Sequence, residues 1–256
     1  MKLYAFVITR FFNQVATNKK FTNSKNPNLH QGLDQSGSIR AAVFGINDGL
    51  VSNTSLIVGV AGATQDSKTI LIAGFVGLIS GAFSMAAGEY ISMNSQRELF
   101  ENQIEIEKRE QEQSPKEERE ELAKIYMRRG IPKKQAHILA KKMMKDPKHA
   151  LDVHAREELG LNPQELGSPW GAAFSSFVAF SAGGLVPLIP FFISSRSSNV
   201  IFAAILGIGG LFFVGSALSR FTGRNPVISG LRMMLIGSLA GLVTYLIGSW
   251  MGVKLS

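Results

Sequence analysis

The sequence predicts an all-α, multi-pass membrane protein with five transmembrane helices and a helical domain inserted between the second and the third. Two observations lead to this prediction. Hydrophobic residues make up 45% of the 256-residue chain, and its charges are unevenly distributed. Residues 93–168 hold 15 Lys and Arg and 15 Asp and Glu, whereas the rest of the chain holds only 12 basic and 4 acidic side chains. Long uncharged apolar runs exclude a single water-soluble globule and a disordered chain.

Five runs are long enough to cross a bilayer, since a helix of about 20 apolar residues spans the hydrocarbon. They lie near residues 39–63, 69–92, 170–194, 200–219 and 227–253. Their apolar residues are continuous rather than alternating, which favours helices over a β-barrel. We therefore expect a cytoplasmic N-terminal tail at 1–38, spans one and two in 39–92, the charged helical domain at 93–168, and spans three to five in 169–256.

Basic residues alternate between the predicted loops. The tail, the insert and the loop holding Arg220 and Arg224 are rich in them, whereas the other two loops hold only Lys68 and Arg196. Because Lys and Arg favour the cytoplasmic side, the tail and the insert are predicted to be cytoplasmic. The net charge of +8 lies in termini and short loops rather than on a domain face, which argues against a nucleic-acid partner. The absence of cysteine excludes disulfides and thiolate metal sites.

Two ionisable side chains, Asp48 and Glu89, lie deep within the predicted spans, and each is a candidate functional group because a charge is costly in hydrocarbon. Asp48 of span one lies on a stripe of small and polar residues, which borders either a water-filled path or a closely packed helix. In span two, Met85 and Glu89 are four residues apart and share a helix face. A thioether beside a carboxylate suits a transition metal. The alternatives are ordinary packing for Met85 and an interfacial acid for Glu89.

The charged insert contains the start signals of several helices. No Pro or Gly occurs between Ser92 and Gln113, so the helix of span two is expected to continue beyond the membrane. Pro115, Pro132 and Pro147 each open a further helix, because proline favours the first helical position.

Acidic pairs in the insert are spaced so that each pair lies on one helix face. The pairs are Glu107 with Glu110, Glu118 with Glu121, and His154 with Glu158. Helices that fold back at Pro115 can bring them together as an oxygen-rich site for Fe²⁺, Mn²⁺ or Zn²⁺. The alternative is a solvated face that pairs with the neighbouring Lys and Arg.

Four motifs, in this order, resemble those of the vacuolar iron transporter family, which includes the yeast Ca²⁺-sensitivity-complementing vacuolar carriers. They are Asn47–Ser52 (NDGLVS), Ser84–Tyr90 (SMAAGEY), Glu157–Leu161 (EELGL) and Gly184–Pro190 (GLVPLIP). The resemblance covers residues 38–253 and implies a five-span homodimer that exports Fe²⁺, often Mn²⁺, in exchange for protons. It also implies that Asp48 and Met85 line the path at the dimer interface and that insert glutamates collect metal, namely Glu107, Glu110, Glu118, Glu121 and Glu158.

The chain also departs from the family pattern. His154 stands where plant members have Met, and acids of those members are replaced here at positions that look like Gly37, Ala41 and Gly77. Glu89, in turn, stands where they have Gly. Proton coupling through Glu89 instead of Asp48, or weaker coupling, is therefore left open.

From these observations we expect a proton-coupled exporter of Fe²⁺ or Mn²⁺ that serves metal detoxification and homeostasis. A desolvated carboxylate takes a proton or a metal ion, which gives exchange a physical basis. We expect no enzymatic activity and no bound cofactor. The expected partners are divalent metals, protons, the lipid bilayer and a second copy of the chain. A bacterial inner membrane is the favoured location and a vacuolar membrane the alternative.

Two other functions compete with transport. A membrane-anchored, carboxylate-bridged iron protein or ferroxidase would use the acidic cluster, but the insert lacks the Glu-x-x-His motif of di-iron bundles. A scaffold without transport would leave Asp48 without a role.

Overall fold

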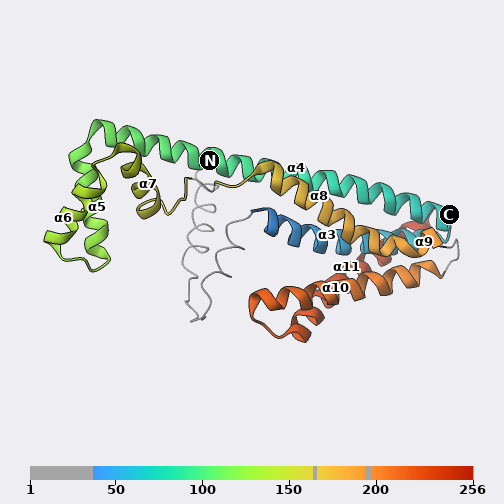
Figure 1. Cartoon of the computed structure of the whole chain (residues 1–256). Helices are drawn as coiled ribbons and strands as arrows, with labels where there is room; N and C mark the ends of the chain where they lie inside the picture. Colours follow the sequence, from blue (N-terminus) through green and yellow to red (C-terminus); the bar gives the residue numbers. More distant parts are fainter. Residues whose placement is uncertain (1–36, 164–165, 194–197, 256) are drawn as a thin grey trace. The chain divides into compact units, whose positions relative to one another are not determined.

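A computed structural model describes residues 37–163, 166–193 and 198–255. Every regular element within these ranges is helical (Figure 1). Among the described residues, five segments are long and apolar enough to cross a membrane: α3 (Gly37–Ala63), α4 (Ser67–Gln113), Pro169–Ile193, α10 (Asn199–Thr222) and α11 (Pro226–Leu255). The predicted all-helical membrane fold with five spans is thereby confirmed. The predicted tail lies outside the described residues except for Gly37 and Ser38.

Helix α3 is the central helix of the apolar region and contacts α8 (Pro169–Leu185), α11, α4 and α10. Glycines allow two of these helices to touch through their backbones. A Cβ on Gly49 would collide with the carbonyl of Phe180, and a Cβ on Gly183 would collide with the carbonyl of Ile46. Such close approach is the usual way in which membrane helices gain packing energy. It holds α8 directly against the residues that follow Asp48.

The third span is interrupted where its two prolines lie. Helix α8 ends at Leu185, a 3₁₀ turn η1 (Val186–Leu188) follows, and α9 (Ile189–Ile193) completes the span. Pro187 and Pro190 have no N–H to donate, so the helical hydrogen-bond ladder is broken there. The side chain of Asn53 supplies a donor instead, because its Nδ2 lies 2.6 Å from the carbonyl oxygen of Gly184.

Helix α4 is much longer than a membrane requires. Its 47 residues extend about 70 Å at about 1.5 Å per residue, more than twice the hydrocarbon thickness. Asp66 caps its first turn, accepting a hydrogen bond from the backbone N–H of Thr69 at 3.0 Å. The chain then turns at Ser114, which is the N-cap residue of the next helix but makes no side-chain cap bond.

Three short helices follow α4: α5 (Pro115–Arg128), α6 (Lys133–Met143) and α7 (Pro147–Glu157). Leu122 and Tyr126 of α5 pack with Ala136 and Ala140 of α6 in a small apolar core. Helix α7 contacts both α4 and α5. An ion pair joins Arg129, directly after α5, to Glu157 at the end of α7. This pair fixes the segment that carries the last two predicted ligands.

Replacing Gly49 by Ala is expected to lower the stability of the spans by about 1–3 kcal/mol, because the added methyl group overpacks a backbone contact. The matched control is Gly209→Ala in α10, where nothing lies within 4 Å of an added Cβ. That change should be neutral or stabilising by about 0.5–1 kcal/mol through helix propensity. Thermal unfolding of the purified protein in detergent measures both; equal melting temperatures would contradict the packing described above.

Candidate metal centre

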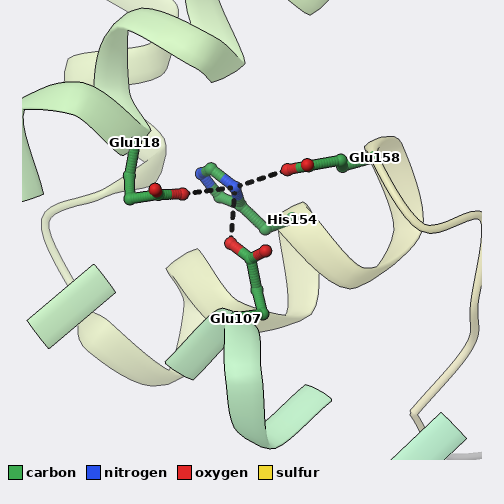
Figure 2. A group of neighbouring side chains, drawn as sticks. All are labelled: Glu107, Glu118, His154 and Glu158. Carbon is green, nitrogen blue, oxygen red and sulfur yellow. Dashed lines mark hydrogen bonds and ion pairs between the residues drawn. The ribbon is translucent and has the colours of Figure 1, made fainter. Parts of the chain in front are cut away.

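Four side chains from three helices converge at one point in the inserted domain (Figure 2). They are Glu107 of α4, Glu118 of α5, His154 of α7 and Glu158 at the end of α7. One potential ligand atom from each lies within 4.8 Å of the others. Nδ1 of His154 is central, since it lies 2.9 Å from an oxygen of Glu107, 3.4 Å from Glu158 and 3.6 Å from Glu118.

Local structure brings these residues together. Glu107 is carried by the extension of α4, and the turn at Ser114 directs α5 back so that Glu118 approaches it. His154 and Glu158 are four residues apart on α7 and hence share its face. Glu107, Glu118 and His154 are only 3%, 8% and 0% exposed. Ionisable groups buried to this extent need a partner; here the imidazole of His154 pairs with the carboxylates, and a metal ion is another partner that such a group could hold.

The charges of the cluster raise the proton affinity of several members. Burial and, next to it, the charge of Glu107 together raise the pKa of Glu118 to about 7. Burial also raises the pKa of Glu158, together with the charges of Glu107 and Glu121. For His154, burial alone would lower the pKa, but the hydrogen bond to Glu107 and its charge outweigh burial, so the pKa is raised. Without a cation the cluster therefore holds protons that a divalent metal would displace.

Two of the predicted insert ligands lie outside this group of four. Glu110 is exposed on α4, three residues beyond Glu107. Glu121 is exposed on α5, although its charge still raises the pKa of Glu118 and of Glu158.

The four clustered side chains offer one imidazole nitrogen and several carboxylate oxygens, a ligand set that fits Fe²⁺, Mn²⁺ or Zn²⁺.

A second polar feature lies within the spans. Asp48 and Met85 line one cavity of about 280 Å³ together with Ser52, Asn53, Ser84 and Phe180. The cavity lies between α3 and α4, and Asp48 is exposed at its edge in the single chain. It places a carboxylate and a thioether at one opening. Met85 also packs against the apolar core of the spans.

The third residue predicted to lie on the path has a different neighbour. Glu89 does not line the cavity, and its carboxylate forms an ion pair with Arg40 of α3 at 3.5 Å. Sequence reasoning missed both Arg40 and Asn53. Arg40 opens the apolar run of span one, and Asn53 is an amide within an apolar helix; each is an unusual residue at its position.

These features define a multi-pass membrane protein with a buried carboxylate–imidazole cluster beyond the second span and a polar cavity within the spans. The chain belongs to the VIT family, whose model matches residues 39–249. The resemblance inferred from the four motifs is thus confirmed.

Named relatives agree with this assignment over most of their length. The chain is 32% identical over 208 residues to vacuolar iron transporter 1 of Eucalyptus grandis, covering 81% of this chain and 84% of that protein. It is 33% identical over 225 residues to a vacuolar iron transporter of Acanthamoeba castellanii, covering 84% of this chain and 79% of that protein. Vacuolar iron transporter 1 of Arabidopsis thaliana is 28% identical over 208 residues, which is 81% of this chain and 83% of that protein.

Stability in the presence of a chelator is expected to fall as the pH rises. The pKa of Glu118 increases from a usual value of 4.5 to about 7 on folding, and that of His154 rises above 6.5. The folded state therefore binds more protons, so this stabilisation is complete below the usual values and disappears as the pH passes the folded values. Melting temperatures between about pH 5 and pH 8 measure it. Glu118→Gln should flatten the profile; an unchanged slope would contradict the assignment.

Replacing Glu107 by Gln is expected to weaken metal binding about tenfold or more, because a buried anionic ligand is lost. The matched control is Glu117→Gln, since Glu117 is an exposed acid of α5 outside the cluster. The rise in melting temperature with increasing Mn²⁺ measures the affinity. Equal affinities for Glu107→Gln and Glu117→Gln would show that the cluster does not hold the metal.

Proposed function

We propose that this protein is a proton-coupled transporter that moves Fe²⁺ or Mn²⁺ out of the cytosol. The observation that carries the proposal is the cavity between α3 and α4, where an acid and a thioether face one opening within the membrane spans. Membership of the VIT family supports it, as do relatives named vacuolar iron transporters. A thioether beside a carboxylate suits a transition metal such as Fe²⁺ better than Ca²⁺ or Mg²⁺.

The cluster of Glu107, Glu118, His154 and Glu158 is proposed to collect metal before transport. Its partly exposed member Glu158 leaves one side open to solvent. The distribution of Lys and Arg in the short loops supports a cytosolic position of the inserted domain. Metal captured there is held at the end of the same helix that carries Met85. The proposed path then leads through the cavity that Asp48 and Met85 line.

Exchange is proposed to occur at Asp48. A carboxylate within the hydrocarbon must be neutralised, and a proton and a divalent cation compete for the same oxygens. A proton that arrives from the far side therefore displaces the metal. Glu89 is less suited to this role, because the guanidinium of Arg40 already neutralises its carboxylate. We therefore propose Asp48 as the exchange group and Glu89 as part of the entrance.

The proposed working form is a homodimer. In the single chain Asp48 is exposed, and so are apolar residues of the same region of α4, among them Val76, Ile79 and Phe83. An acid that faced lipid alone would be costly, so a polar neighbour is expected beside it. A second copy packed against α3 and α4 would enclose the cavity of each protomer and remove Asp48 from lipid.

The protein is proposed to lie in its membrane with the N-terminus and the inserted domain on the cytosolic side. Either of the expected locations, the bacterial inner membrane or a vacuolar membrane, meets this condition. The names of the relatives refer to vacuoles. In both cases transport from the insert side removes metal from the cytosol.

Replacing Asp48 by Asn is expected to reduce proton-driven Fe²⁺ uptake into proteoliposomes at least tenfold, because an amide cannot exchange a proton for a metal ion. Glu89→Gln serves as the comparison and should retain a pH-dependent flux. Uptake is followed with a metal-sensitive dye at two opposite pH gradients. Full pH-driven flux in the Asp48→Asn protein would exclude Asp48 as the exchange group.

A further inference from the structure

Asn53 is an amide buried within an apolar span. It lies on α3, five residues after Asp48, and is only 2% exposed. Its Nδ2 donates a hydrogen bond of 2.6 Å to the carbonyl oxygen of Gly184. That carbonyl lies three residues before Pro187, which has no N–H with which to satisfy it. The Asn53 amide therefore compensates for the interruption of the third span.

This hydrogen bond also orients the rest of the amide. Only the nitrogen of an Asn side chain donates, so a donor role at Gly184 directs Oδ1 the other way. Oδ1 is buried and has no hydrogen-bond partner. It lies 3.8 Å from the position that a Cβ would take on Gly77 of α4. The unpaired oxygen thus faces α4, where a methyl group of Leu56 covers Gly77.

Asn53, Leu56 and Gly77 all line the cavity already described, together with Asp48 and Met85. A buried acceptor without a partner is uncommon and costly, and it points to a ligand that the cavity receives. An amide oxygen is a good ligand for divalent cations, as are carboxylates.

Neighbouring buried hydroxyls do not share this position. Thr54 is 4% exposed, and its Oγ1 also lacks a partner. However, Thr54 packs against Gly207 of α10 and does not line the cavity. Asn53 therefore differs from Thr54 in that its residue lines the cavity of Asp48 and Met85 and also carries an unpaired oxygen.

We propose that the side-chain oxygen of Asn53 is a ligand of the permeating divalent cation, alongside the carboxylate of Asp48 and the thioether of Met85. This inference rests on the proposed transport function and adds a determinant of selectivity to it. An amide binds a metal ion but does not take up a proton near neutral pH. Asn53 therefore strengthens metal binding without adding a proton site, and it favours metal over proton at the exchange point.

The experiment compares Asn53→Leu, Asn53→Asp and Thr54→Val in the full-length protein, reconstituted in proteoliposomes at one fixed pH gradient. The readout is the Mn²⁺ concentration that gives half-maximal uptake. All variants keep the cytoplasmic cluster, so differences between them report on the cavity. Asn53→Leu should raise the half-saturating concentration about tenfold, because a metal ligand is lost. Thr54→Val, the matched control, should leave it unchanged.

Asn53→Asp separates binding from structure. Aspartate keeps an oxygen toward the cavity but, when ionised, loses the donor to Gly184. If Asn53 is a ligand, this variant binds Mn²⁺ at least as tightly as the wild type, and its uptake depends more steeply on pH. If Asn53 only satisfies Gly184, Asp and Leu lower the melting temperature and the maximal flux alike, with unchanged half-saturation, and the inference is overturned.

Two further outcomes are decisive. If Asn53→Leu does not fold, the Asp variant alone decides, and a raised half-saturating concentration in that folded protein overturns the inference. Wild-type half-saturation in Asn53→Leu overturns the role of Asn53 while leaving the transport function intact. A wild-type protein that moves no Mn²⁺ or Fe²⁺ at any pH gradient removes the proposed function, and this inference with it.

Discussion

An ionised carboxylate cannot remain unneutralised in hydrocarbon, and this constraint explains most of what surrounds Asp48. It accounts for the polar groups that line the cavity between α3 and α4, Ser52, Asn53 and Ser84. Glu89 meets the same constraint in a different way, through the guanidinium of Arg40. Glu89 thus has a cationic partner within the chain, whereas Asp48 is the acid for which we propose an exchangeable one.

In the inserted domain, too, the negative charge of neighbouring carboxylates must be neutralised. Glu107, Glu118 and Glu158 surround one imidazole, and their mutual repulsion is relieved by bound protons, as the raised pKa values of Glu118 and His154 indicate. Metal binding would replace those protons, so the same competition operates in the cluster and in the cavity. His154 adds to the cluster a side chain that titrates near neutral pH.

The helices could be predicted from sequence because apolar runs of membrane length and prolines at first helical positions are local signals. Pro115 and Pro147 open α5 and α7 as expected, and the uninterrupted stretch after Ser92 continues α4. The composition of the site was harder to predict from the sequence. By their spacing, Glu107 and Glu110 share one helix face and are equally good candidates. Only the position of α7, which an ion pair between Arg129 and Glu157 joins to the end of α5, places His154 beside Glu107 rather than Glu110. The roles of these residues remain predictions.

Contacts between distant residues account for what sequence reasoning missed. Arg40 and Glu89 are 49 residues apart, and Asn53 and Gly184 are 131 apart. No local spacing announces such partners. An amide in an apolar helix indicates that a buried hydrogen-bond partner is needed. Where the amide oxygen points depends on the carbonyl that another span leaves free, which the sequence does not show.

The length of α4 has a mechanical consequence. Met85 and Glu107 belong to one unbroken helix, and their 22-residue separation corresponds to about 33 Å at about 1.5 Å per residue. A stiff rod of this kind cannot shorten between its ends. A rotation or sliding of α4 at Glu107 would therefore also displace the thioether of Met85, so a movement at one end of the helix could not leave the other end unchanged.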